Sequence, residues 1–225
     1  LNALLVRESG GPKGASDVVV HRARVAPPAF DARFSALRRS YTYRVCDVPE
    51  RYDPLRRFDV LWVGEQLDVP AINKAATSLL GEHDFISYCP PREGARTSRE
   101  VQRREGVRQV AGCEIRATAD AFCHSMVRTL VGSLLKVGRG ACDEKWPRRR
   151  LDERLRNGEV IVAPPHPLTL QRVDYPPDDE LAARARQARN VRGVGGCLVA
   201  RWLGHAPAPS RTAANYVADS MRLCF

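Results

Sequence analysis

One arginine lies in an otherwise apolar stretch that is typical of a buried helix. Residues 121–138 read AFCHSMVRTLVGSLLKVG, and at about 3.6 residues per turn their apolar side chains cover a wide arc. Arg128 falls at the boundary of this arc, one turn from His124. A guanidinium pairs best with a carboxylate or a phosphate, so Arg128 would hold such a group if it points into a site beside the core. The alternative is a flanking arginine whose stem lies on apolar surface while its head reaches water.

The composition favours a polyanionic partner. The chain has 225 residues, of which 44% are hydrophobic, enough for one large domain or two small ones. The formal net charge is +10 and the pI about 9.7, with basic residues spread along the chain. Such a balance indicates nucleic acid first and an anionic membrane surface second. No apolar run approaches the roughly 20 residues that a membrane-spanning helix needs.

The seven cysteines are scattered and form no C-x-x-C pair. This spacing predicts neither a zinc knuckle nor a redox pair, and the simplest interpretation is reduced thiols in a cytoplasmic protein. We also find no glycine-rich phosphate loop and no nucleophile elbow in the sequence. The residues alone therefore point to no cofactor chemistry.

Periodicity and turn residues predict an α+β fold, with an antiparallel sheet backed by helices. In the segment SYTYRV, 40–45, alternation places Tyr41 and Tyr43 on one face of a strand. Pro147 is expected to interrupt a charged, partly helical segment. The helix over 178–190 is expected to be solvated, and the chain from about Val191 poorly ordered. The expected strands are 17–25, 40–45, 99–105, 109–118 and 167–175, and the expected helices are 69–81, 121–138 and 178–190.

Four stretches, in order, resemble the tRNA pseudouridine synthase A family. They are FDARFSALRRSYTYRV (30–45), LLGEHDFISY with ARTSREV (79–101), ADAFCHSMVRTLVGSLLKVG (119–138) and APPHPLTLQRVDYP (163–176). The resemblance implies an isomerase without cofactor or metal, which detaches uracil at N1 and rejoins it through C5. It implies uridines on the 3′ side of the tRNA anticodon stem and loop as the substrate. It further implies two related halves that meet at a basic cleft, and a homodimer.

The resemblance also assigns site residues. At the position of Arg128 the family has an arginine that pairs with the catalytic aspartate, and a nearby guanidinium keeps a carboxylate in a cleft ionised. Tyr41 matches the tyrosine that lies against the target base, where an aromatic ring can stack and a phenol can carry a proton. Leu170 would line the uracil pocket. From pattern alone, a core aromatic paired with Tyr43 is the favoured interpretation of Tyr41, and an ordinary strand core residue fits Leu170 equally well.

Five further arginines are expected to contact RNA phosphates. Their alternative is solvated charge that makes no RNA contact. They are Arg33, Arg38 and Arg39 around Tyr41, and Arg96 and Arg99 farther along the chain.

The sequence departs from the family pattern at the catalytic aspartate. The family carries its catalytic aspartate in a Gly-Arg-Thr-Asp-Ala segment, and no such segment occurs here. We therefore expect an incomplete synthase whose first half-domain is largely missing, with an inactive RNA-binding fragment as the alternative. The expected divisions are a remnant of the first half with its link (1–48), the C-terminal half (49–180), and a basic helix with a tail (181–225).

Overall fold

The computed structural model describes residues 1–90, 97–110, 112–156 and 158–193, and it shows one six-stranded sheet. The strand order is β2-β1-β5-β4-β3, and β6 lies beside the part of β1 that β2 leaves unpaired. All pairs are antiparallel except the short β1–β2 pair, which is parallel. The α+β class is confirmed, but the sheet is mixed rather than wholly antiparallel. The strands are β1 (Arg38–Cys46), β2 (Leu61–Trp62), β3 (Gly81–Asp84), β4 (Ser98–Gln109), β5 (Gly112–Ala119) and β6 (Leu168–Asp174).

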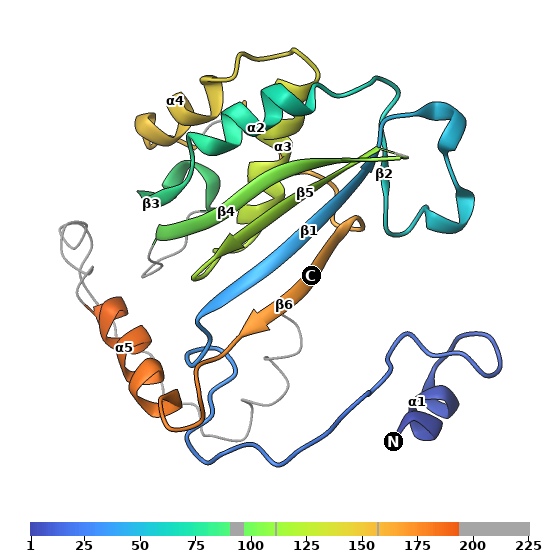
Figure 1. Ribbon diagram of the computed structural model, residues 1–225, viewed down its shortest axis with the longest axis vertical. Helices are drawn as coiled ribbons and strands as arrows, with labels where there is room; N and C mark the ends of the chain where they lie inside the picture. The colour runs from blue at the N-terminus through green and yellow to red at the C-terminus, as the bar shows by residue number, and fades with distance from the viewer. Residues whose placement is uncertain (91–96, 111, 157, 194–225) are drawn as a thin grey trace, which may run out of the picture.

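Three helices gather on one side of this sheet, while the first and last lie apart from them (Figure 1). The three are α2 (Val69–Thr77), α3 (Met126–Gly138) and α4 (Trp146–Glu153). The others are α1 (Asn2–Glu8) and α5 (Leu181–Gly193), and short 3₁₀ turns occur at η1 (Pro49–Arg51), η2 (Pro54–Arg56) and η3 (Ile86–Tyr88). The strand expected over 17–25 is wrong, because these residues pair with no strand and most are exposed.

Local chemistry sets where the helices begin. Asp68 caps α2 by accepting a hydrogen bond from the Ala71 backbone N–H at 2.8 Å. The helix expected from residue 121 begins only at Met126, because Ser125 adopts a left-handed backbone with φ of 57°. His124 is therefore exposed and outside α3. Pro147 lies in the first turn of α4, so it starts this helix and does not interrupt a longer one.

The core lies between the sheet and its helices and forms two neighbouring clusters. The first joins the sheet to α2 and α3, with Tyr43, Ile72, Val131 and Leu134 among its buried members. The second joins the start of α3 to η3 and α4, and includes Leu79, Phe85, Tyr88, Met126 and Leu130. The apolar arc read from 121–138 thus packs on both clusters. At Gly138 the helix packs closely on Ile72, since a Cβ there would lie 2.7 Å from its Cδ1 and the isoleucine side chain would have to shift.

An ion pair closes the far end of the sheet. Asp47, which is 2% exposed, accepts hydrogen bonds from Nη1 of Arg108 at 2.6 and 2.8 Å. It also accepts the Leu67 backbone N–H at 2.8 Å. These bonds tie the end of β1 to β4 and to the segment that leads into α2.

The thiol prediction is wrong for one pair. Cys89 and Cys123 form a disulfide with Cα atoms 5.9 Å apart, although 34 residues separate them. The fold brings the end of η3 beside the segment before α3. The spacing of the cysteines in the sequence does not predict this pairing. Cys46, Cys113 and Cys142 are free thiols.

The helix α5 is also less solvated than expected. Leu181 and Ala185 are buried, and Ser35 donates its hydroxyl to the Leu181 carbonyl at 3.3 Å. Arg189 pairs with Asp31 at 2.7 Å. One face of α5 therefore packs on the segment before β1.

Candidate functional site

Tyr41 and Leu170 meet across two neighbouring strands. They are register partners between β1 and β6, next to a bulge at Ser40 and Tyr41. The Tyr41 ring is half-buried and meets Phe122 edge to face, with centroids 5.3 Å apart. Leu170 is 39% exposed. The two side chains thus form an aromatic and aliphatic surface at the border of the first core cluster.

Arg128 reaches the same face of the sheet from α3. Its Nε is buried and has no hydrogen-bond partner among the described residues, nor does a described carboxylate come within ion-pair distance of its head. Its charge acts on Tyr43, two residues from Tyr41 on the same strand face: burial raises the pKa of Tyr43, and Arg128 opposes that rise. Arg128 as a whole is only partly buried, but a buried Nε without a hydrogen-bond partner among the described residues is costly, so an anion beside it would be favourable.

A neighbouring segment fixes the position of Arg128. Its carbonyl oxygen accepts the Ala163 backbone N–H at 3.1 Å. One turn later a Cβ on Gly132 would lie 2.1 Å from the Ile161 carbonyl oxygen, so only glycine admits this close approach. The same segment leads through Pro164, whose carbonyl oxygen accepts the Tyr43 hydroxyl at 3.0 Å, and on to β6. Arg128, Tyr43 and the strand that carries Leu170 are therefore held together.

The arginines expected to bind RNA are placed differently from one another. Arg38 is half exposed and pairs with Asp174 at 2.6 Å. Arg39 donates to the carbonyl oxygens of Asp120 and Arg33, so part of its role is to hold the chain before β1. The Arg33 guanidinium lies 5.5 Å from the ring centre of Phe34.

The other two predicted RNA contacts lie farther along the chain. Arg99, on β4, donates to the Ser98 carbonyl oxygen at 2.6 Å, and its Nε is buried. Arg96 lies outside the described residues. The structure therefore groups Arg33, Arg38 and Arg39 near one end of β1. Arg99 lies next to Glu100, whose backbone N–H donates to Asp120, the residue whose carbonyl oxygen accepts from Arg39.

The electrostatics at this end of β1 centre on Asp174. Hydrogen bonds from Arg38 and Arg172 lower the pKa of its carboxyl group. Asp174 also pairs in register with Arg38 across β1 and β6. The carboxylate thus offsets part of the positive charge without cancelling it.

Two members of the site region were missed from the sequence. Phe122 was counted as a helix residue, but it lies in the turn before α3 and its ring supports Tyr41. Arg104 on β4 is 4% exposed, and none of its three side-chain nitrogens has a hydrogen-bond partner among the described residues. Burial lowers the pKa of Arg104 to about 10. Alternation along β4 gave no signal for it, because a bulge between Val101 and Arg103 shifts the phase.

Together these residues offer an aromatic ring, an aliphatic side chain and a partly buried cation. Such a set fits a planar neutral base beside an ionised acid. Within the described ranges, no group of three or more His, Cys, Asp or Glu residues could hold a metal ion. None of the helices in those ranges has the length and hydrophobicity of a membrane span.

Comparison with known proteins gives the family. The tRNA pseudouridine synthase family matches residues 75–176. Proteins named tRNA pseudouridine synthase A are similar to this chain. The one from Frankia casuarinae is 54% identical over 74% of this chain and 61% of its own length. Those from Streptomyces griseus and Leifsonia xyli are 51% and 46% identical, over 80% and 85% of this chain and 66% and 67% of their own lengths.

The mixed α+β fold is consistent with the pseudouridine synthases, and the similarity to these relatives gives that class. The chain belongs to the tRNA pseudouridine synthase A family. It spans about two thirds of the length of the curated relatives that it matches.

Proposed function

We propose that this chain takes part in the isomerisation of uridine to pseudouridine in tRNA, on the 3′ side of the anticodon stem and loop. The observation that carries the proposal is the buried Nε of Arg128, which has no hydrogen-bond partner among the described residues and whose charge acts on Tyr43, on the strand face that also bears Tyr41. In this proposal the uracil lies between the Tyr41 ring and Leu170. The glycosidic bond between N1 and C1′ breaks, a bond from C1′ to C5 forms, and the loss of the C5 proton is balanced by protonation of N1.

The role of Arg128 is to keep a carboxylate ionised next to the base. A buried acid without a partner drifts toward its neutral form, and a guanidinium within a few ångströms reverses that drift. The sequence contains no Gly-Arg-Thr-Asp-Ala segment, and we found no carboxylate beside Arg128 among the described residues. We therefore propose that the acid comes from a segment outside this sequence.

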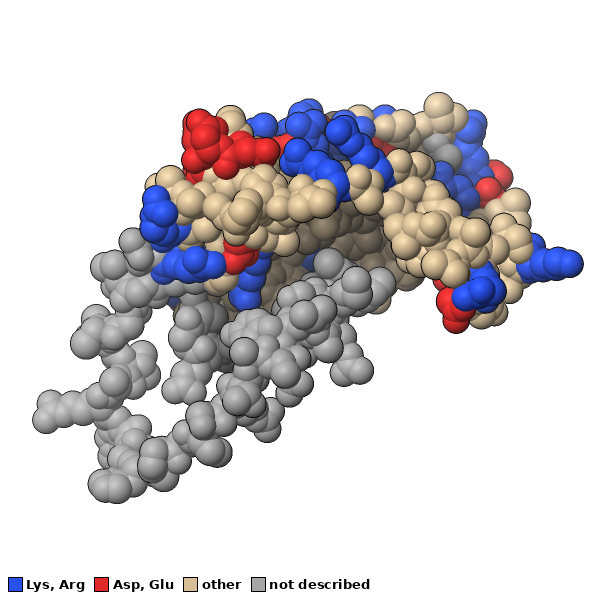
Figure 2. Space-filling view, turned by 90° about the horizontal axis from the view of Figure 1, so that it is seen from below, with Lys and Arg blue, Asp and Glu red and all other residues tan. Residues whose placement is uncertain are grey.

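Charge supports RNA as the partner. Figure 2 shows one face of the molecule hollowed near its centre, where the visible rim is made mainly of uncharged residues and a group of Lys and Arg side chains lies along the edge above it. The net charge of +10 is consistent with attraction to a polyanion. We propose tRNA as the substrate, a homodimer as the complete assembly, and the cytoplasm as the place of action.

The second candidate is a binding module that holds RNA without chemistry. The absence of the aspartate segment from the sequence favours it. The two candidates share the RNA surface and differ only in whether an acid ever reaches Arg128.

The deciding experiment maps pseudouridine in an unmodified tRNA transcript. The full chain is incubated with the transcript alone, and also with a second polypeptide that supplies the part of the Streptomyces griseus relative which this chain does not match. We expect product only in the mixture, and its loss when Arg128 is replaced by Met. Salt-sensitive tRNA binding without product in either arm would instead support the binding module. Absence of both would overturn the RNA proposal.

A further inference from the structure

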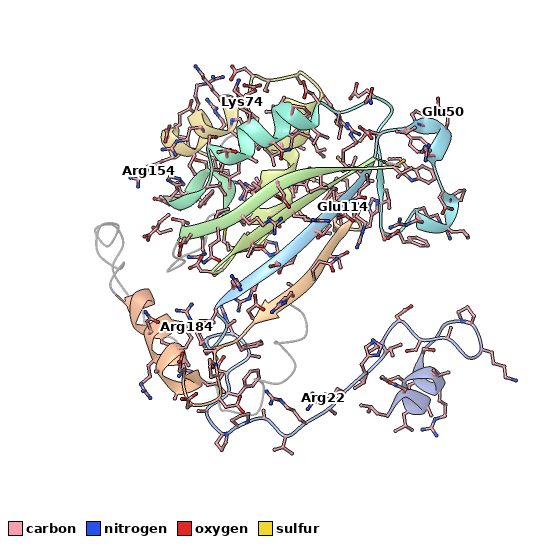
Figure 3. All side chains as sticks on the ribbon, in the orientation of Figure 1. Arg22, Glu50, Lys74, Glu114, Arg154 and Arg184 are labelled. Atoms are coloured by element: carbon pink, nitrogen blue, oxygen red, sulfur yellow. A yellow bond between two sulfur atoms is a disulfide. The ribbon has the colours of Figure 1, made fainter. Side chains whose placement is uncertain are left out.

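The segment between β1 and β2 is rich in arginine and aromatic residues that the proposed reaction does not use. Residues 51–62 read RYDPLRRFDVLW. Figure 1 shows this segment, with η1 and η2, projecting beyond the end of the sheet, away from α5. In Figure 3, Glu50 lies on it and Glu114 lies on the neighbouring sheet. Interleaved arginine and aromatic side chains are typical of surfaces that bind unpaired nucleotides.

A cavity of about 300 Å³ lies between this segment and the ends of β1 and β5. This volume is at the lower end for ligand sites and suits one nucleotide. Its lining includes Arg44, Arg51, Arg56, Trp62, Gln109 and Glu114. Arg44 is three residues from Tyr41 along β1, which places the cavity roughly 10 Å farther along the strand.

The cavity lining carries three arginines against the two carboxylates of Asp53 and Glu114, so its formal charge is +1. Arg44 approaches Glu114 at 3.5 Å and donates to the Thr169 hydroxyl at 3.0 Å. Arg56 pairs with Asp59 at 2.6 Å. The exposed Arg51 has no side-chain hydrogen bond or ion pair with any described residue. Its guanidinium is thus available for a phosphate.

The aromatic part of the lining is held rigid. Trp62 stacks on Tyr52 with the ring centres 4.8 Å apart and the planes 5° from parallel. The Tyr52 hydroxyl donates to the Val63 carbonyl oxygen at 2.6 Å, and Tyr52 does not line the cavity. Trp62 is therefore supported by Tyr52 while it borders the cavity. At the tip of the segment, Phe58 is 70% exposed and lies 4.2 Å from the Arg57 guanidinium.

We propose that this cavity binds a second, unpaired nucleotide of the RNA, distinct from the uridine that is isomerised. Its base stacks on Trp62, and its phosphate is bound by Arg51. Phe58 and Arg57 contact the flanking nucleotide. The inference rests on tRNA being the partner, as proposed above, but it concerns a contact that the reaction itself does not need. A free mononucleotide shares the same chemistry, and the test separates the two sources.

The test measures binding of a fluorescent tRNA by the full chain at fixed salt. We expect the double variant with Arg51→Gln and Phe58→Ser to bind about tenfold more weakly, since stacking of one base contributes ~1–3 kcal/mol. The matched control is Arg22→Gln, which removes the same charge from an exposed residue far from the segment (Figure 3). It should change binding less than about twofold. Equal weakening by both variants would mean that only general charge attraction acts, and would overturn the inference.

Two further measurements locate the contact. Trp62→Phe keeps a stacking face and should retain binding, whereas Trp62→Leu should lose it, with circular dichroism confirming that both variants are folded. Ultraviolet crosslinking of tRNA followed by mass spectrometry should place a nucleotide adduct within residues 51–62. An adduct confined to other segments overturns the inference, as does displacement of tRNA from this segment by micromolar uridine monophosphate alone. If the wild-type chain fails to bind tRNA at all, the proposed function fails first.

Discussion

Tyr41 and Leu170 are direct cross-strand partners beside the bulge in the pairing of β1 with β6. Two residues farther along the same face, Tyr43 pairs with Leu168. Tyr43 is fully buried and Leu168 packs against the first core cluster, whereas Tyr41 is half-buried and Leu170 is 39% exposed. On this face of the β1–β6 pair, the side chains of one residue pair thus lie in the core, and those of the next pair, two residues along, are partly exposed.

This contrast gives a matched pair of truncations. Leu168→Ala removes core contacts and should lower the free energy of unfolding by about 1–3 kcal/mol. Leu170→Ala should lower it by less than about 1 kcal/mol, because much of the side chain is already exposed. In the two-component tRNA assay, however, Leu170→Ala should reduce product several-fold. Urea unfolding and pseudouridine mapping check the two halves of this prediction, and equal losses of stability would contradict the packing difference.

Arg128 should be more valuable to function than to stability. Replacing it by Met removes a buried Nε donor that has no hydrogen-bond partner in the described part of the chain, so the free energy of unfolding should rise by about 1 kcal/mol. The same change should abolish product in the two-component assay. Arg128→Lys keeps the charge but loses the planar fork, and should restore only a small fraction of the activity. A destabilised Arg128→Met variant would show that the guanidinium already has a partner in the fold.

Arg104 is expected to lower the free energy of unfolding. Burial lowers its pKa to about 10, so the folded chain carries a penalty for the charged form at every pH below that value, and the penalty is relieved as the pH rises through it. Arg104→Met should therefore raise the free energy of unfolding by about 1–4 kcal/mol at neutral pH. Thermal melts of the two proteins measure this. A loss of stability would indicate an anionic partner from beyond the described residues.

The Asp47–Arg108 pair should respond unequally to its two deletions. The Asp47 side chain is fully buried, whereas Arg108 is 39% exposed. Arg108→Met leaves a buried carboxylate with only the Leu67 N–H and should cost about 3–5 kcal/mol. Asp47→Asn leaves Arg108 free to reach water and should cost about 1–2 kcal/mol. Urea unfolding of both variants measures these losses, and a larger loss of stability for Asp47→Asn than for Arg108→Met would contradict the prediction.

Acid should weaken the pairing of Arg38 and Arg172 with Asp174. The pKa of Asp174 is lower in the folded chain than in the unfolded chain. Its contribution to the free energy of unfolding is therefore complete above the unfolded pKa of about 4, and it is lost as the pH falls through the folded pKa. The difference in melting temperature between the wild type and Asp174→Asn should be constant between about pH 6 and 8 and shrink below about pH 4. A difference that persists unchanged into acid would assign the effect to packing.

Local pattern predicted the parts of the site that lie on single elements. Alternation placed Tyr41 and Tyr43 on one face of β1, and burial confirms this: Tyr43 is in the core and Tyr41 packs against it. The apolar arc of residues 126–138 is the buried surface of α3. These features depend on the repeat of a strand or a helix, which a sequence displays directly. The unexpected start of α3 follows from the backbone of Ser125, which residue type did not announce.

The sequence by itself determined the composition of the site: an arginine in an apolar helix, a tyrosine on an alternating strand, and a leucine on a later strand. The tertiary structure decided which of them meet. It placed residues 161–163 against Gly132, put Leu170 opposite Tyr41, and turned Arg104 inward through a bulge. It also joined Cys89 to Cys123. Each of these contacts depends on packing between segments that are distant in the chain. In a strand, one added residue turns every following side chain to the opposite face of the sheet, so a local pattern cannot specify such contacts.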